Sequence, residues 1–94
     1  MYIQMNYNVT DLRWDSFKNE RLKRERGVSF EEIILARFLA VIEHPSRANQ
    51  KIILFEREEY VWVVPYVKRE KETFLKTMFP SRKYTRMWKR GELP

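Results

Sequence analysis

The side chains that could do chemistry gather near the end of the chain, where basic and aromatic residues alternate. Residues 79–91 read FPSRKYTRMWKRG, so a Pro-Ser step is followed by five cations, a tyrosine and a tryptophan. Residues 68–94 contain nine Lys and Arg but three Asp and Glu, whereas residues 1–67 contain ten of each, so the net charge of +6 arises in the last quarter. Such asymmetry is typical of a protein with an anionic partner: RNA, DNA, an acidic protein or a membrane surface.

Length and composition predict one folded domain over residues 1–94, with a loose lead-in at residues 1–8. The 94 residues are 44% hydrophobic and 15% aromatic, which is enough apolar surface for a small core. The chain has no cysteine and one histidine, so we expect no disulfide, no metal site and no cofactor. No apolar run approaches the ~18 residues of a spanning helix, and the N-terminus lacks a signal-peptide pattern, so we expect a soluble cytoplasmic protein.

The elements that must position the basic residues begin with a strand and a surface helix. A short strand is expected over Val9–Trp14. The following helix is expected over Ser16–Arg26, because Asp15 or Ser16 can cap its start and Gly27 can end it in a left-handed conformation.

The start of a second helix is the clearest local signal. Ser29-Phe30-Glu31-Glu32 has the pattern of a capping box, in which Ser29 and Glu32 each bond the other's backbone amide. The apolar positions beyond it keep helical spacing, and the helix is expected to give way to a strand near Phe38–Glu43. The residues that share this spacing are Phe30, Ile33, Ile34, Arg37, Phe38 and Val41.

The second half of the chain predicts strands and a closing helix. Strands are expected over Lys51–Glu56, Tyr60–Val67 and Thr73–Phe79, with charged turns between them, and a helix over Ser81–Arg90. Pro65 cannot donate to a strand ladder, so it predicts a bulge or a locally unpaired edge. The expected order is β-α-α-β-β-β-β-α: an α+β domain in which a small antiparallel sheet carries two N-terminal helices and a C-terminal helix.

The segment Leu12–Ala36 resembles the N-terminal half of the BrnT-type ribonuclease toxins. That family reads, approximately, as an aromatic-Trp-Asp strand end, a Lys-Asn helix, Lys-His-Gly, and then a Val-Ser-Phe-Glu-Glu-Ala helix start. Phe79–Lys83 resembles the Ser-Ala-Arg-Lys segment after that family's last strand, and the second half of the chain resembles a related group of small toxin-like proteins. Ten positions match in order: Trp14, Asp15, Lys18, Asn19, Gly27, Val28, Ser29, Phe30, Glu31 and Glu32.

The resemblance implies a RelE-like fold, cleavage of RNA, and neutralisation by a small co-encoded antitoxin that often also binds DNA. The function that it implies is that of the toxin in a type II toxin–antitoxin system, a metal-independent endoribonuclease that can form a hetero-oligomer with its antitoxin. One position departs from the family. Arg24-Glu25-Arg26-Gly27 stands in place of Lys-His-Gly, so no role of that histidine carries over.

Cleaving RNA without a metal requires a base for the 2′-hydroxyl, cations for the charged transition state, and an acid for the leaving 5′-oxygen. Arg82 is the first candidate cation, because it follows the last expected strand and lies near a helix start. We expect the basic residues to converge on one face. The catalytic candidates are Arg82, Lys83, Lys76 and Tyr84, and the RNA-binding candidates are Lys68, Arg69, Arg86, Lys89 and Arg90.

The acid and the base stay open. Tyr84 could donate a proton, and Glu58 or Glu59 could accept one if their hairpin lies near the cations. The tyrosine also belongs to an i, i+3, i+4 stripe that is more typical of a helix face packed on a sheet: Tyr84, Met87 and Trp88. His44 precedes a proline and reads as a turn residue rather than a general base.

Two other functions fit the same residues. A non-catalytic basic module that binds nucleic acid or a protein partner would share the charge asymmetry without an acid and a base. A relative of the toxins that has lost catalysis would explain the missing histidine. Membrane binding fits least well, because the closing helix is short and its apolar stripe is needed for the core.

Overall fold

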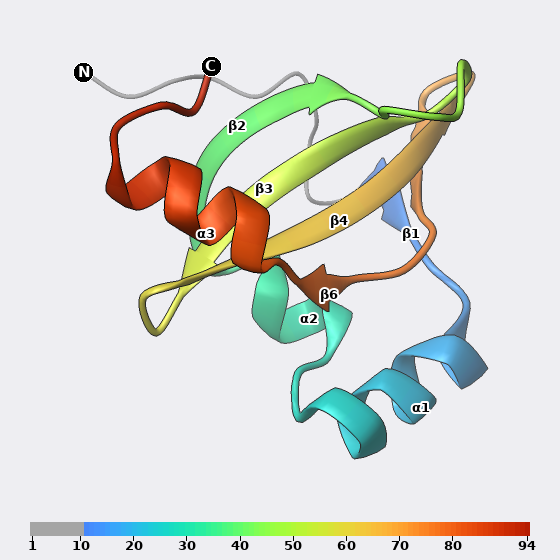
Figure 1. Cartoon of the computed structure of the whole chain (residues 1–94). Helices are drawn as coiled ribbons and strands as arrows, with labels where there is room; N and C mark the ends of the chain where they lie inside the picture. The colour runs from blue at the N-terminus through green and yellow to red at the C-terminus, as the bar shows by residue number, and fades with distance from the viewer. Residues whose placement is uncertain (1–10) are drawn as a thin grey trace.

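The computed structural model describes residues 11–94 as a curved sheet with helices on both faces (Figure 1). The expected lead-in at residues 1–8 and the first two residues of the expected first strand, Val9 and Thr10, lie outside the described residues. The elements are β1 Leu12–Arg13, α1 Ser16–Arg26, α2 Phe30–Ile33, β2 Arg37–Glu43, β3 Lys51–Arg57, β4 Tyr60–Arg69, β5 Glu72–Leu75, β6 Phe79–Pro80 and α3 Arg82–Lys89.

The strands form one sheet in the order β1-β5-β4-β3-β2, and β6 pairs with β4 beyond the end of β5. Neighbours from β2 to β6 pair antiparallel, as expected for strands joined by short connections. β1 instead runs parallel to β5, so the sheet is mixed rather than purely antiparallel. The structure otherwise confirms the predicted α+β class, with two N-terminal helices and one C-terminal helix on a small sheet.

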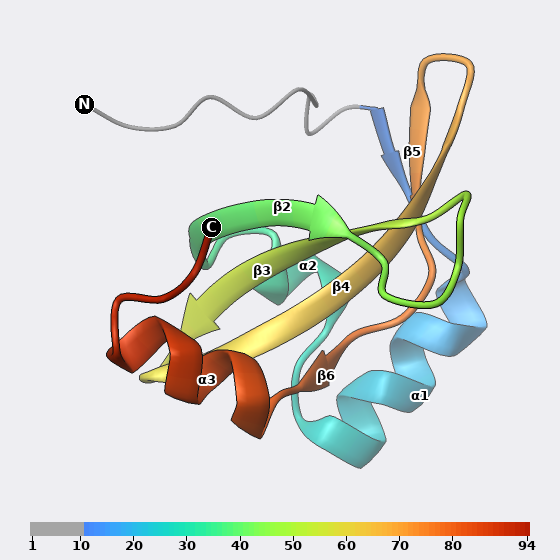
Figure 2. The same cartoon turned by 45° about the horizontal axis from the view of Figure 1, so that its top comes forward.

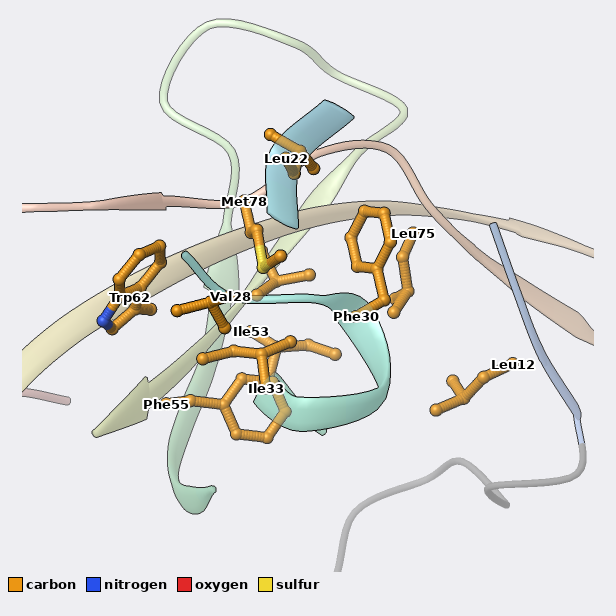
Figure 3. Close-up of a cluster of buried hydrophobic side chains, with 11 residues drawn as sticks. Leu12, Leu22, Val28, Phe30, Ile33, Ile53, Phe55, Trp62, Leu75 and Met78 are labelled. Atoms are coloured by element: carbon orange, nitrogen blue, oxygen red, sulfur yellow. The ribbon is translucent and has the colours of Figure 1, made fainter. Parts of the chain in front are cut away.

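Both faces of the central strands are buried, because alternate residues of a strand point to opposite faces. On one face, β3 and β4 pack against α1 and α2, and Figure 3 shows this cluster, which includes Leu22, Phe30, Ile33, Ile53, Phe55, Trp62, Leu75 and Met78. On the other face, β2 to β4 pack against α3 through Ala40, Ile52, Leu54, Val61, Val63, Tyr84 and Trp88. The near-continuous apolar run at residues 60–64 therefore serves both faces.

The positions that match the toxin family build the corner between α1 and α2. Asp15 caps α1, as its carboxylate accepts from the Lys18 amide at 2.9 Å, and Gly27 ends the helix with a φ of 77°. The predicted bounds of this helix are confirmed at both ends. The predicted capping box is confirmed too, with Ser29 and Glu32 bonded to each other's amides.

Asn19 connects the two helices. Its side-chain oxygen accepts from the Phe30 amide at 2.7 Å, and its side-chain amide donates to Glu31 Oε1 at 2.6 Å. The Trp14 ring stacks on the Phe30 ring with 5.5 Å between centroids. These family-like residues thus hold the geometry of the helix corner, which accounts for their pattern without any chemistry.

Glu32 should make the protein sensitive to acid. Its carboxylate accepts from Lys23 Nζ at 2.7 Å and from the Ser29 amide at 2.8 Å, and these bonds, that of Lys23 first, lower its pKa from 4.5 to about 2. The folded state therefore binds this proton more weakly than the unfolded chain does. The resulting stability is fully present above pH 4.5 and is lost as the pH falls toward 2.

In Glu32→Gln, the free energy of unfolding should decrease less between pH 4.5 and about 2 than it does in the parent protein. Urea unfolding across this pH range measures the decrease. Glu25→Gln is the matched control, since this α1 carboxylate makes no hydrogen bond or ion pair within residues 11–94. It should leave the pH profile unchanged. Equal profiles for the parent and Glu32→Gln would contradict the role of the Lys23 and Ser29 bonds.

The strand that the sequence predicts near Phe38–Glu43 is confirmed, since β2 spans Arg37–Glu43. The helix before it is shorter than its apolar spacing suggests, because α2 ends at Ile33. The reason is pairing: β2 runs along β3 from Arg37 to Glu43, with an irregularity between Phe38 and Ala40. An apolar run whose spacing fits both a helix and a strand forms a strand here, because the strand completes the sheet.

The last predicted strand is divided into β5 and β6 by residues 76–78. The Lys76 amide donates to the Pro65 carbonyl at 2.8 Å, on the side of β4 that β5 and β6 share. The nitrogen of Pro65 points to the same side but carries no hydrogen, so the ladder stops there. This agrees with the locally unpaired edge predicted at Pro65. The chain then resumes as β6, and Met78 between the two strands is fully buried.

The turn between β3 and β4 is strained. Glu58 and Glu59 have φ values of 54° and 65°. These values lie in the left-handed region, which residues other than Gly and Asn rarely adopt. Two consecutive positive φ values mark a type I′ turn, for which Asn-Gly is the favoured pair.

Replacing both residues, Glu58→Asn with Glu59→Gly, should raise the free energy of unfolding by about 1 kcal/mol, because it relieves left-handed strain. Urea unfolding measures the gain. Glu58→Gln is the control, as it removes a charge but keeps the Cβ atom. An equal gain from Glu58→Gln would point to charge repulsion instead of backbone strain.

Candidate nucleic-acid interface

Helix α3 is fixed to the sheet at its first turn. The Ser81 amide donates to the Val61 carbonyl at 2.9 Å, and the Val61 amide donates to Thr85 Oγ1 at 2.8 Å. The Thr85 hydroxyl donates to the Ser81 carbonyl at 2.6 Å, and Ser81 Oγ caps the helix by accepting from the Tyr84 amide. Tyr84 and Trp88 pack on the sheet, as the stripe in the sequence predicts. The orientation of α3 is therefore well defined.

The opposite face of α3 is basic. At 100° per residue, its cations fall within about a third of the helix circumference. All are exposed, and none forms an ion pair with another described residue. The five cations, called the α3 basic face below, are Arg82, Lys83, Arg86, Lys89 and Arg90.

Two members of the α3 basic face lie where the helix disfavours them. Arg82 and Lys83 stand in the first turn, which contains no acidic residue. Positive charge at a helix N-terminus opposes the helix dipole and costs about 0.3–1 kcal/mol. Lys83 Nζ lies 5.5 Å from the centre of the Tyr84 ring, which offsets part of that cost. An anion bound here would relieve the remainder.

Lys76 borders a different surface. Its ammonium lies 5.6 Å from the centre of the Phe74 ring, and both side chains line an open pocket of about 630 Å³. α1 forms the other wall, since the segment after β5 runs beside this helix in both views (Figure 2). The α1 residues at the pocket are Asp15, Phe17, Lys18, Glu20, Arg21 and Arg24.

Lys68 and Arg69 lie at the end of β4 remote from α3. Ser81 is bonded to Val61, seven residues before Lys68, and seven residues of strand span about 23 Å. Lys68 Nζ also donates to Thr73 Oγ1 at 3.2 Å. The nine candidates therefore do not share one face. The structure brings together the α3 basic face with Tyr84, and it separates Lys76 and the Lys68–Arg69 pair from them.

The sequence reasoning missed the cations of α1. Lys18, Arg21 and Arg24 recur every three residues in a helix whose bounds were predicted correctly, and this spacing is the signal that could have found them. Counting charge over residues 1–67 hid them, because carboxylates elsewhere in the segment balance the total.

The candidate proton donors and acceptors are placed as follows. Tyr84 is half-buried under the α3 basic face. The turn with Glu58 and Glu59 lies at the α3 end of β4, and Glu59 is two residues, about 7 Å, before Val61. His44 Nδ1 accepts from the amides of the two following turn residues at 3.1 and 3.2 Å, namely Ser46 and Arg47. The histidine is thus the turn residue that the sequence predicts.

Two further searches cover the described part of the chain. Within residues 11–94, no three His, Cys, Asp or Glu side chains are placed to hold a metal ion. Over the same residues, no helix combines the length and the apolar character needed to cross a bilayer.

Comparison with known proteins gives one relation of shape. No model of a known protein family matches the chain, and no curated protein matches it. Among solved structures, the chain is similar to a crystal structure of the Brucella abortus ribonuclease toxin BrnT, with a TM-score of 0.49 and 17% sequence identity, over 74% of this chain and 94% of that chain.

Proposed function

We propose that this protein is the toxin of a type II toxin–antitoxin system and cleaves RNA without a metal ion. The observation that carries the proposal is the α3 basic face: five exposed cations, free of ion pairs among the described residues, on a helix held rigidly to the sheet. A fixed row of cations suits a polyanion with regularly spaced phosphates. The ten family-like positions in residues 14–32 add a resemblance to the toxin family, although their contacts are structural.

The proposed chemistry uses side chains at the first turn of α3. Arg82 and Lys83 bind the scissile phosphate and stabilise the charge that develops on its non-bridging oxygens. Glu59 takes the 2′-hydroxyl proton, the 2′-oxygen attacks phosphorus, and the P–O5′ bond breaks. Tyr84 gives a proton to the leaving 5′-oxygen, so the products are a 2′,3′-cyclic phosphate and a 5′-hydroxyl.

The remaining candidates bind the strand on either side of the scissile phosphate. Arg86, Lys89 and Arg90 continue the α3 basic face and contact flanking phosphates. Lys68 and Arg69, at the end of β4 remote from α3, and Lys76, at the pocket beside α1, contact more distant parts of the RNA. A small antitoxin with an acidic segment would silence the enzyme by covering the α3 basic face, and the substrate places this activity in the cytoplasm.

Inducible expression in a bacterial host tests this function. The chain should arrest growth and cause loss of intact cellular RNA, because the α3 basic face is free to bind it. Co-expression of the product of the adjacent reading frame should restore growth. Unimpaired growth with full-length RNA, at a level of soluble protein confirmed by immunoblot, would contradict the proposal.

A second function, a non-catalytic module that binds nucleic acid, is favoured by one observation. Within residues 11–94, no carboxylate or imidazole is bonded to a cation of the α3 basic face. The face therefore offers positive charge for binding RNA, but no acid or base in contact with that charge for cleaving it. Tight RNA binding without cleavage, with and without ribosomes, would support this module over the enzyme.

A further inference from the structure

The pocket between α1 and the end of β5 has the composition of a site for single-stranded nucleic acid. We infer that it binds an RNA strand, with one base stacked on Phe17 and the neighbouring phosphates on Lys18, Arg21, Arg24 and Lys76. The choice of RNA rests on the proposed function. The α1 cations and Phe17 had no role in that function.

The charge of the pocket fits a polyanion. Four cations and two carboxylates line it, which leaves two net positive charges. None of the four cations forms an ion pair within the described part of the chain. Of the two carboxylates, Asp15 accepts a hydrogen bond from the Lys18 amide as the cap of α1, and both are included in this net charge. Arg21 has a like charge three residues away on each side, and an anion bound among the three cations would reduce their mutual repulsion.

The aromatic rings fit a base. Phe17 is 82% exposed, although Leu22, about one and a half turns further along α1, is buried. Phe74, half-buried across the pocket, has the Lys76 ammonium against its ring. Exposed rings among cations are the combination that single-strand binders use, because every base has a face that can stack.

The site is rigid before anything binds. Asn19 joins α1 to the start of α2, and Arg26 donates to the carbonyl of Met78, in the segment between β5 and β6. α1 is therefore held at both ends of its length against the rest of the fold. Binding would not have to order the helix, which favours affinity.

The pocket and the α3 basic face lie on opposite faces of the sheet, and the segment 76–81 connects them along the side of β4. Lys76 is bonded to Pro65 and Ser81 to Val61, four residues apart on β4, or about 13 Å. This is the separation of the two backbone anchors along β4, and an RNA strand that contacts both surfaces must also pass around the side of the sheet. The pocket is therefore a second contact for a long RNA strand, separate from the α3 basic face.

Fluorescence anisotropy with a 12-nucleotide unstructured 2′-O-methyl RNA tests the inference. This probe has no free 2′-hydroxyl, so its binding is measured without cleavage. Phe17→Leu, which keeps an apolar side chain but loses the ring, should weaken binding at least about fivefold, the low end of one base stack. Phe17→Trp should restore it. Arg21→Ala should weaken binding and reduce the slope of log K against log salt by about 0.7.

Arg47→Ala, which removes a charge from the turn after β2, is the control. It should change neither the affinity for the probe nor the slope of log K against log salt. Parent-like affinity of both Phe17→Leu and Arg21→Ala would overturn the inference. So would equally tight binding of an oligoglutamate peptide of the same charge, since that would assign the pocket to an acidic protein. Because the probe cannot be cut, these outcomes do not depend on whether the chain is a nuclease.

Discussion

Arg82→Ala should lower the rate of RNA cleavage by about 100- to 1,000-fold, the usual loss when one group that stabilises transition-state charge is removed. The fold should be unaffected. Arg82 is exposed, makes no ion pair among the described residues, and opposes the dipole of α3 in its first turn. Its removal should therefore change the free energy of unfolding by no more than about 0.5 kcal/mol.

Single-turnover cleavage of a fluorescent oligoribonucleotide measures the rate, and urea unfolding measures the stability. Arg47→Ala removes the same side chain from a distant exposed turn, and its rate should equal that of the parent. Arg82→Lys should be intermediate, because lysine keeps the charge but loses the paired N–H donors. If Arg82→Ala and Arg47→Ala cleave RNA at the same rate, Arg82 does not belong to the catalytic site.

Phe30→Ala should lower the free energy of unfolding by about 3–5 kcal/mol, the range for a buried phenylalanine. Phe30 is fully buried, stacks on Trp14 at 5.5 Å and belongs to the cluster between α1, α2 and the sheet. A domain of this size has about 5–15 kcal/mol in total, so most of its stability is at stake.

Phe17→Ala is the matched control, since the same side chain is removed from a position that is 82% exposed. It should change stability by no more than about 0.5 kcal/mol. Urea midpoints of the two variants give the comparison. Similar losses from both would contradict the burial of Phe30 in the cluster between α1, α2 and the sheet.

The sequence predicts an element well where its signals are local. α1 is predicted at both ends because Asp15 and Gly27 act on their own neighbours. The start of α2 is predicted for the same reason, and the strand after it is predicted within one residue, but the end of α2 at Ile33 is not. The helical spacing runs on to Val41, whereas Arg37–Glu43 pairs with β3, which lies beyond the next turn. The division of the last strand likewise depends on Pro65 of a neighbouring strand.

The candidate site divides in the same way. The α3 basic face and its buried stripe are predicted because both follow from the period of one helix. The separation of Lys68 and Arg69 from Arg82 is not, because it is set by the register of β6 on β4. The pocket beside α1 is missed since Lys76, more than fifty residues after Arg24, reaches it only through the fold.

The central claim is that the α3 basic face binds a phosphodiester for cleavage. Its most direct test is to map the RNA ends that the purified chain produces. The antitoxin-free protein is incubated with RNA, alone and on ribosomes, in the presence of a metal chelator. We predict strand breaks that carry a 2′,3′-cyclic phosphate and a 5′-hydroxyl, and that vanish with Arg82→Ala. RNA that stays intact in both settings, or breaks that need a divalent metal, would contradict it.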